Sequence, residues 1–172
     1  MLTTQLLIAL HPCMLQRSRI NLYNDEEPVN NAAAYRTSGH TKGLFLFDDN
    51  TGLWLVHSVP KFPQAAAFGR YAYPHSGQEF GQTFLCVTYP TSQLDTIVTH
   101  LRLQDPDIYD GDASPSMLKE HSGLYLLLHH HYIRNPPWLT QRPLFTSTSP
   151  LHPQPALATL CNTHRCRRTA LR

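Results

Sequence analysis

The clearest hydrophobic pattern in the chain lies between residues 43 and 60, where a short polar turn separates two apolar runs. Residues 44–47 are continuously apolar, which is typical of a central strand buried on both faces. The second run, residues 53–59, ends at Pro60. Because the intervening sequence is Asp-Asn-Thr-Gly, the two runs predict an antiparallel β-hairpin.

Beyond the hairpin, the pattern predicts one more strand and one helix. Residues 84–89 form another apolar run, which a proline stops, and they predict a buried strand. Residues 92–103 place apolar side chains at helical spacing behind Thr91 or Ser92 as a cap. Residues 61–80, between the hairpin and this strand, are rich in proline, glycine, tyrosine and serine, so we expect an irregular loop there.

The segment after residue 103 is acidic and then apolar. Its four aspartates are Asp105, Asp107, Asp110 and Asp112. Their spacing is similar to that of a calcium-binding loop, but Pro106 interrupts the register and no glutamate closes it, so we expect a solvent-exposed acidic loop. Residues 124–128 are apolar enough to predict a strand. The expected fold class is mixed α/β, a β-sheet with an antiparallel hairpin flanked by helices.

Length and charge predict one folded unit with a different composition at its ends. A chain of 172 residues is too short for two ordinary domains. No apolar run approaches the roughly 18–20 residues that a membrane-spanning helix needs, and the amino terminus shows no convincing secretory signal. All twelve acidic residues lie between residues 25 and 120, whereas residues 121–172 contain six arginines and no acid.

Candidate chemistry begins with His40 and Lys42, which lie two residues apart and therefore project from the same side of a strand. If the hairpin turn is symmetric about Asn50-Thr51, Leu44 lies opposite His57, and His57 shares the face of Lys42. Two imidazoles and one ammonium would then form one patch. Asp48 is too far along the strand to orient the ring of His40.

Such a patch is suited to phosphoryl transfer. A neutral imidazole can attack phosphorus, an ammonium can neutralise the nonbridging oxygens, and a second, protonated imidazole can donate to the departing oxygen. This chemistry requires no cofactor and no metal. The alternative is that a structural histidine simply lies beside a solvated lysine, because His-x-Lys is a very short pattern.

A metal site built from His129-His130-His131 with Cys161 and Cys166 is a weaker alternative. Three consecutive histidines on a strand would alternate between its faces, so they cannot all bind one ion. The Cys-x4-Cys spacing also lacks the second pair that a structural zinc site needs. Of the four cysteines, only Cys86 lies in an apolar run typical of a core, and we expect it to be a buried free thiol.

Several motifs, in this order, resemble the deoxyribonuclease II family. They are Leu22-Tyr23-Asn24-Asp25, Gly39-His40-Thr41-Lys42-Gly43, residues 53–63, Tyr73-Pro74-His75-Ser76-Gly77 and residues 81–87. The resemblance is continuous over about residues 22–90. It implies that residues 22–148 form part of one half of a phospholipase D-like domain. Residues 1–21 would then be a non-family amino terminus, and residues 149–172 a basic, proline-rich, disordered tail.

The resemblance also implies an activity. Members of this family are lysosomal acid endonucleases that hydrolyse DNA without divalent metal and leave 3′-phosphate ends, through a phosphohistidine-type mechanism. The motifs place the catalytic residues at His40, Lys42 and His57, with DNA as the substrate and no cofactor.

One departure from the family pattern affects the expected site. In the wider superfamily a second His-x-Lys motif completes the site, but in this chain only His40 has a lysine two positions later. A complete site would then require a homodimer or pairing with a second half that bears this motif. The alternative is an incompetent fragment that binds DNA, or a full-length relative, through the late arginines.

Overall fold

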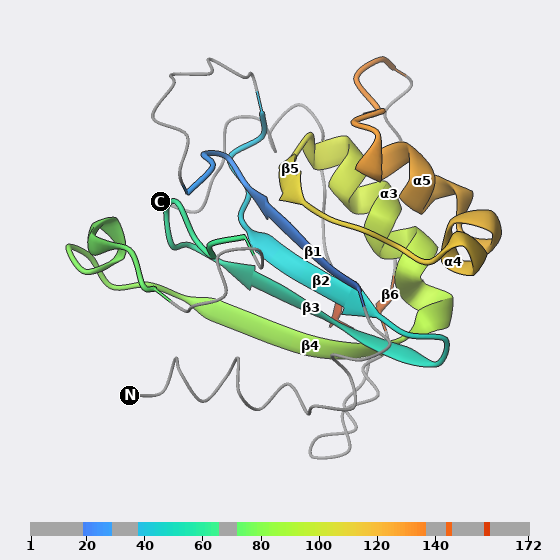
Figure 1. Ribbon diagram of the computed structural model, residues 1–172, viewed down its shortest axis with the longest axis horizontal. Coiled ribbons are helices and arrows are strands. Elements are labelled where there is room, and N and C mark those ends of the chain that lie inside the picture. Colours follow the sequence, from blue (N-terminus) through green and yellow to red (C-terminus); the bar gives the residue numbers. More distant parts are fainter. Residues whose placement is uncertain (1–18, 29–37, 66–71, 137–143, 146–156, 159–172) are drawn as a thin grey trace.

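A five-stranded antiparallel sheet forms the centre of the protein (Figure 1). The computed structural model describes residues 19–28, 38–65, 72–136, 144–145 and 157–158. The strands of the sheet are β1 (Arg19–Asn24), β2 (Gly43–Phe47), β3 (Thr51–His57), β4 (Phe84–Pro90) and β5 (Asp107–Asp110). Their order is β4-β3-β2-β1-β5, so β2 is central and β4 lies at an edge. A separate short pair joins β6 (Leu144–Phe145) to β7 (Leu157–Ala158).

Helices cover one face of this sheet. They are α3 (Leu94–Gln104), α4 (Pro115–Glu120) and α5 (Ser122–Leu128), with 3-10 turns η2 (His75–Gly77) and η3 (Thr91–Gln93). Apolar residues of α3 and α5 form one core with the aromatic side chains Tyr23, Phe45 and Trp54 of the sheet. The fold is therefore mixed α/β, as expected. In the described part of the chain, no helix has the length and apolar character needed to cross a membrane.

The hairpin is confirmed, but its register differs from the expected one. Phe47 pairs with Gly52, and Leu44 pairs with Leu55 instead of His57. The turn is centred on Asp49-Asn50 because the carboxylate of Asp48 accepts hydrogen bonds from the backbone N–H groups of Asn50 and Thr51, at 2.8 Å each. A shift by two residues leaves every side chain on its expected face.

The helix α3 begins slightly later than the sequence predicts. Residues 91–93 form the turn η3, and Gln93 at the helix start makes no side-chain cap. The expected cap Thr91 instead donates its hydroxyl to the carbonyl of Asp48, 2.8 Å away. This bond ties the start of the helix to the turn of the hairpin.

Two predictions after residue 103 are wrong. Residues 124–128 belong to helix α5 and not to a strand, because Leu124 and Leu127, three residues apart, both face the core. Residues 107–110 form strand β5, which pairs with β1, so this acidic segment is not a solvent-exposed loop. Asp105 is buried as well, and the guanidinium of Arg134 donates two hydrogen bonds to its carboxylate, each 3.0 Å long.

Cys86 is free, as expected, but it is exposed and not buried. It lies on the edge strand β4, and its neighbour Leu85 is also exposed. The apolar run that suggested burial therefore covers a strand whose central part faces solvent.

Candidate active site

The three predicted site residues lie at one end of the sheet, where β1, β2 and β3 end or begin together. Lys42 directly precedes β2, and His57 is the last residue of β3. The backbone N–H of His57 donates to the carbonyl of Lys42 at 3.1 Å, which continues the ladder that pairs Gly43 with Val56. Because directly opposed residues point to the same face, Lys42 and His57 share the sheet face that lies away from the helices. Five buried leucines of β1, β2 and β3 form an apolar cluster on that face, with Ile20, Phe84 and Tyr109 packed against them.

Asp25, which directly follows β1, bridges the two residues of the His-x-Lys motif. Its Oδ2 atom contacts the Nδ1 atom of His40, and its Oδ1 atom lies 2.6 Å from the Nζ atom of Lys42. The Nζ atom of Lys42 is also 3.5 Å from Nδ1 of His40. The lysine side chain is 5% exposed, whereas the imidazole is 56% exposed. One carboxylate therefore joins a buried ammonium to an imidazole that is open to solvent.

This arrangement determines which nitrogen of His40 is available for chemistry. A carboxylate beside Nδ1 accepts the proton that this nitrogen carries. The other ring nitrogen, Nε2, then keeps its lone pair. A neutral imidazole in this tautomer can act as a nucleophile through Nε2.

Asp25 was not among the residues singled out for chemistry in the sequence. It belongs to the first motif of the family resemblance, but nothing in its local sequence indicates that it reaches His40 or Lys42. The contact depends on the antiparallel pairing of β1 with β2, in which Tyr23 faces Gly43. Only that pairing brings the residue after β1 beside the residues before β2.

Asn24 fixes the direction in which the chain leaves β1. Its buried side-chain amide donates to the carbonyls of Phe62, at 2.8 Å, and Val59, at 3.3 Å. Its side-chain oxygen accepts from the backbone N–H of Glu26 at 3.3 Å. These bonds join the end of β1 to the segment after β3 and thereby hold Asp25 at the site.

His57 differs from His40 in both burial and partners. Its side chain is 6% exposed and packs against the rings of Phe62 and Phe84, with centroids 5.5 and 5.7 Å away. Its Nδ1 atom accepts a hydrogen bond from the backbone N–H of Val59 at 3.2 Å. The neutral ring therefore carries its proton on Nε2, which is buried and has no hydrogen-bond partner in the described part of the chain.

The electrostatic environment keeps His57 neutral. Burial, and next the positive charge of Lys42, lower the pKa of His57 from 6.5 to about 4, although Asp25 opposes this shift. The sequence suggested a protonated second imidazole as the proton donor. His57 does not fit that role, because its ring is neutral in mild acid and its Nε2 atom, which carries the proton, is enclosed.

Other motifs of the resemblance meet around the end of β3. The hydroxyl of Ser58 donates to the side-chain oxygen of Gln82 at 2.6 Å and accepts from the backbone N–H of Thr83 at 2.9 Å. The hydroxyl of Ser76, in η2, donates to the carbonyl of Pro60 at 3.3 Å. Segments that are distant in the sequence are thus joined next to His57.

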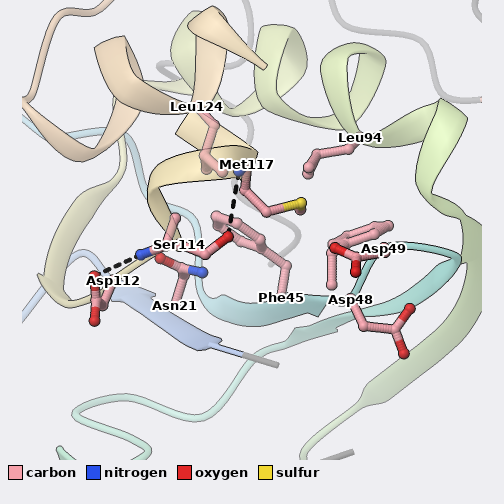
Figure 2. A pocket seen from close by; sticks show the side chains of 11 residues that line it. Asn21, Phe45, Asp48, Asp49, Leu94, Asp112, Ser114, Met117 and Leu124 are labelled. Carbon is pink, nitrogen blue, oxygen red and sulfur yellow. Dashed lines mark hydrogen bonds between the residues drawn. The ribbon is translucent and has the colours of Figure 1, made fainter. Parts of the chain in front are cut away.

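A separate pocket lies at the other end of the hairpin, beside its turn (Figure 2). Asp48 and Asp49 line it together with apolar side chains of the sheet and helices, and the hydroxyl of Ser114 accepts from the backbone N–H of Met117 there at 3.2 Å. None of the residues predicted to be catalytic lines this pocket.

The metal site proposed as an alternative has no support from the described residues, in which no three His, Cys, Asp or Glu side chains are grouped to hold an ion. His129 and His130 follow helix α5 and do not lie on a strand. The Nδ1 atom of His129 is 2.8 Å from the carbonyl of Tyr125, and that of His130 is 2.8 Å from the hydroxyl of Tyr132. Cys161 and Cys166 lie outside the described residues.

Comparisons with known proteins identify the relatives of this chain. It is 39% identical over 118 residues to deoxyribonuclease-2-alpha of Mus musculus, which is 68% of this chain and 33% of the mouse protein. It is 36% identical over 120 residues to plancitoxin-1 of Acanthaster planci, covering 70% of this chain and 33% of that protein. Deoxyribonuclease-2 of Caenorhabditis elegans is 40% identical over 100 residues, which is 58% of this chain and 26% of the nematode protein.

The chain thus spans about a third of the length of the mouse and Acanthaster relatives. The family model for deoxyribonuclease II matches residues 4–151. This match begins before residue 22, where we expected the family-like part to begin, and ends close to the expected boundary at residue 149. Because the match extends over most of the sequence, the chain belongs to the deoxyribonuclease II family.

Proposed function

We propose that this chain supplies the His40–Lys42 half of an acid endonuclease site, which hydrolyses DNA phosphodiester bonds without a metal ion and leaves 3′-phosphate ends. The observation that best supports this proposal is the cluster in which Asp25 contacts both His40 and Lys42. It combines a solvent-exposed imidazole nucleophile with a fixed positive charge. The fold would then be part of one phospholipase D-like half, and the family resemblance favours the lysosome as its compartment.

In the first step, Nε2 of His40 attacks phosphorus and the bond from phosphorus to the 5′ oxygen breaks. The covalent product is a phosphohistidine attached to the 3′ oxygen of the upstream strand, and the 5′ oxygen of the downstream strand leaves with a proton from a general acid. Water then hydrolyses the phosphorus–nitrogen bond, which releases the 3′-phosphate and restores His40. The charge of Lys42, directly behind the imidazole, offsets the negative charge of the phosphate in both steps.

His57 has a different role in this proposal. Its ring is neutral and enclosed, so we assign it to holding the end of β3 against Lys42 and not to proton transfer. The general acid then has to come from a second imidazole, provided by a second His-x-Lys half or by a second copy of this chain.

Plasmid nicking at pH 5 in the presence of a chelator tests the proposal. The chain, alone or mixed with a separate half that bears only the second His-x-Lys motif, is expected to nick the plasmid, and His40→Ala should abolish nicking. His75→Ala is the matched control, because His75 is exposed and outside the cluster. Nicking that survives in His40→Ala protein, or that requires added metal, would contradict the proposal. DNA binding that weakens with salt, without nicking in any mixture, would support the alternative of an incompetent DNA-binding fragment.

A further inference from the structure

We propose that Asp25 is a positioning residue, which holds the imidazole of His40 in the tautomer that attacks phosphorus and holds Lys42 behind it. This inference rests on the proposed function, because it assigns a role within the same site. It adds a residue that the His-x-Lys pattern does not contain.

The two carboxylate oxygens of Asp25 are used by different partners. Oδ2 contacts Nδ1 of His40, and Oδ1 lies 2.6 Å from Nζ of Lys42. Because each oxygen has its own partner, the carboxylate plane fixes the imidazole and the ammonium relative to each other. A carboxylate bound to one partner alone would leave the other free to rotate.

The contact with His40 selects a tautomer. Which ring nitrogen of a neutral histidine keeps the proton is set by the hydrogen bond that the other nitrogen makes. Two groups lie at Nδ1 of His40: Oδ2 of Asp25, which can only accept, and Nζ of Lys42, 3.5 Å away, which can only donate. The carboxylate oxygen is the nearer of the two, and Lys42 has its own partner in Oδ1 of Asp25, so the proton stays on Nδ1 and the lone pair stays on Nε2. This is the logic by which a carboxylate orients the imidazole of a catalytic triad.

The contact with Lys42 explains why the carboxylate has to be charged. Lys42 is 5% exposed, and a buried ammonium without a partner is strongly unfavourable. In the described part of the chain, Asp25 is the only carboxylate within 4 Å of this ammonium. The side chain of Asp25 is itself 17% exposed, so the pair is screened only partly by water.

The structure also holds Asp25 in place from outside the cluster. Asn24, its neighbour, is anchored to the carbonyls of Phe62 and Val59, as described above. The carboxylate is therefore fixed on one side by the chain that leaves β1 and on the other by its two partners. A side chain restrained in this way is suited to positioning a nucleophile.

The test replaces the carboxylate in the full chain by Asp25→Asn, which has the same shape but no charge and can donate a hydrogen bond. Nitrogen-15 NMR of the histidine rings at pH 9, above the range in which histidine ordinarily titrates, reports the tautomer of His40. We expect the Nδ1-protonated form in the unmodified chain and the Nε2-protonated form in the variant. Nicking at pH 5 should fall about 10⁴-fold, as it does where the same change gives a catalytic imidazole the wrong tautomer.

Asp95→Asn is the matched control, because Asp95, on helix α3, is a carboxylate that lies 3.1 Å from Nδ1 of another histidine, His121. It should leave the tautomer of His40 unchanged. If Asp25→Asn does not fold, the double variant Asp25→Asn with Lys42→Met removes the unpaired charge and allows the same NMR measurement. An Nε2-protonated His40 in the unmodified chain, or an unchanged tautomer in the folded variant, would overturn the inference. The expected tautomer switch in a chain that never nicks DNA would support the positioning contact and contradict the proposed function instead.

Discussion

The backbone N–H of His57 donates a hydrogen bond to the carbonyl of Lys42, 3.1 Å away across the β2–β3 hairpin. This bond adds a further pair to the ladder, and it places both side chains on the same face. The geometry of the site therefore depends directly on the register of the hairpin. Any substitution that disturbs the first pairs of β2 and the last pairs of β3 should disturb the site as well.

The first prediction concerns Gly43, the residue between Lys42 and the rest of β2. A methyl group at this position would collide with the hydroxyl of Tyr23 and the carbonyl of Leu55. Because one of these neighbours is backbone, relief requires strands to move apart. We expect Gly43→Ala to lower the free energy of unfolding by about 2 kcal/mol or more, measured by urea denaturation.

Gly81→Ala is the control for that substitution. A methyl group there would have no atom within 4 Å, so its free energy of unfolding should stay within about 1 kcal/mol of the unmodified chain. Equal stability of the two variants would show that the hairpin end is not packed as described.

The second prediction is a pH dependence of stability due to His57. The pKa of His57 is lowered to about 4 by burial and by Lys42, whereas the same side chain titrates near 6.5 when the chain is unfolded. Between these values the unfolded chain binds more protons, so acid favours unfolding. The contribution of His57 to the free energy of unfolding is fully present above pH 6.5. It is lost as the pH falls toward 4, which lowers the free energy of unfolding by about 3 kcal/mol.

His57→Gln isolates this effect, because glutamine does not titrate and keeps a polar group at the site. Urea denaturation at several pH values should show a steeper loss of stability below pH 6.5 for the unmodified chain than for the variant. Parallel curves for the two proteins would contradict a neutral, buried His57.

Only part of the hairpin and helix geometry can be predicted from the hydrophobic pattern. The hairpin was predictable because a continuous apolar run, a polar turn and a second run leave few alternatives. Its register was not, because the carboxylate of Asp48 binds two backbone N–H groups and thereby selects the turn residues. Five apolar residues, 124–128, fit either a strand or a helix, and only packing against the sheet decides between them.

The candidate site shows the same division. The proximity of His40 to Lys42 was predicted from their spacing. The expectation that both lie on a strand was wrong, because β2 begins only at Gly43. The role of Asp25 could not be predicted from the sequence, because it depends on the pairing of β1 with β2, two strands joined by a long connection. The low pKa of His57 also could not be predicted, because it depends on burial by rings from distant segments, Phe62 and Phe84.

The third prediction concerns Asn24, which anchors the chain before Asp25. Asn24→Ala removes the donor to the carbonyls of Phe62 and Val59 and leaves both without that partner. We expect a loss of about 1–3 kcal/mol in the free energy of unfolding. If Asn24 also positions the carboxylate, the NMR signal of His40 in the folded variant should become a mixture of tautomers. A single, unchanged tautomer would restrict Asn24 to a structural role.

The fourth prediction concerns the source of the general acid. This chain holds one His-x-Lys motif, and the other histidine near it, His57, is neutral and enclosed. In the proposed mechanism, a single copy therefore has a nucleophile without a proton donor for the leaving oxygen. If two copies complete each other's sites, specific activity should rise with protein concentration, because activity then follows the amount of dimer.

Mixing experiments distinguish this arrangement from a self-sufficient monomer. In an equal mixture of unmodified and His40→Ala chains that pair at random, about a quarter of the dimers contain two intact imidazoles, so activity falls further than simple dilution requires. Lys119→Ala chains are the control, because Lys119 lies on α4 outside the cluster, and mixing with them should leave activity per chain unchanged. If specific activity is constant from nanomolar to micromolar concentration, and light scattering gives the mass of one chain, a single copy must supply its own acid. The assignment of His57 as a neutral, structural residue would then be wrong, because it is the only other histidine at the described site.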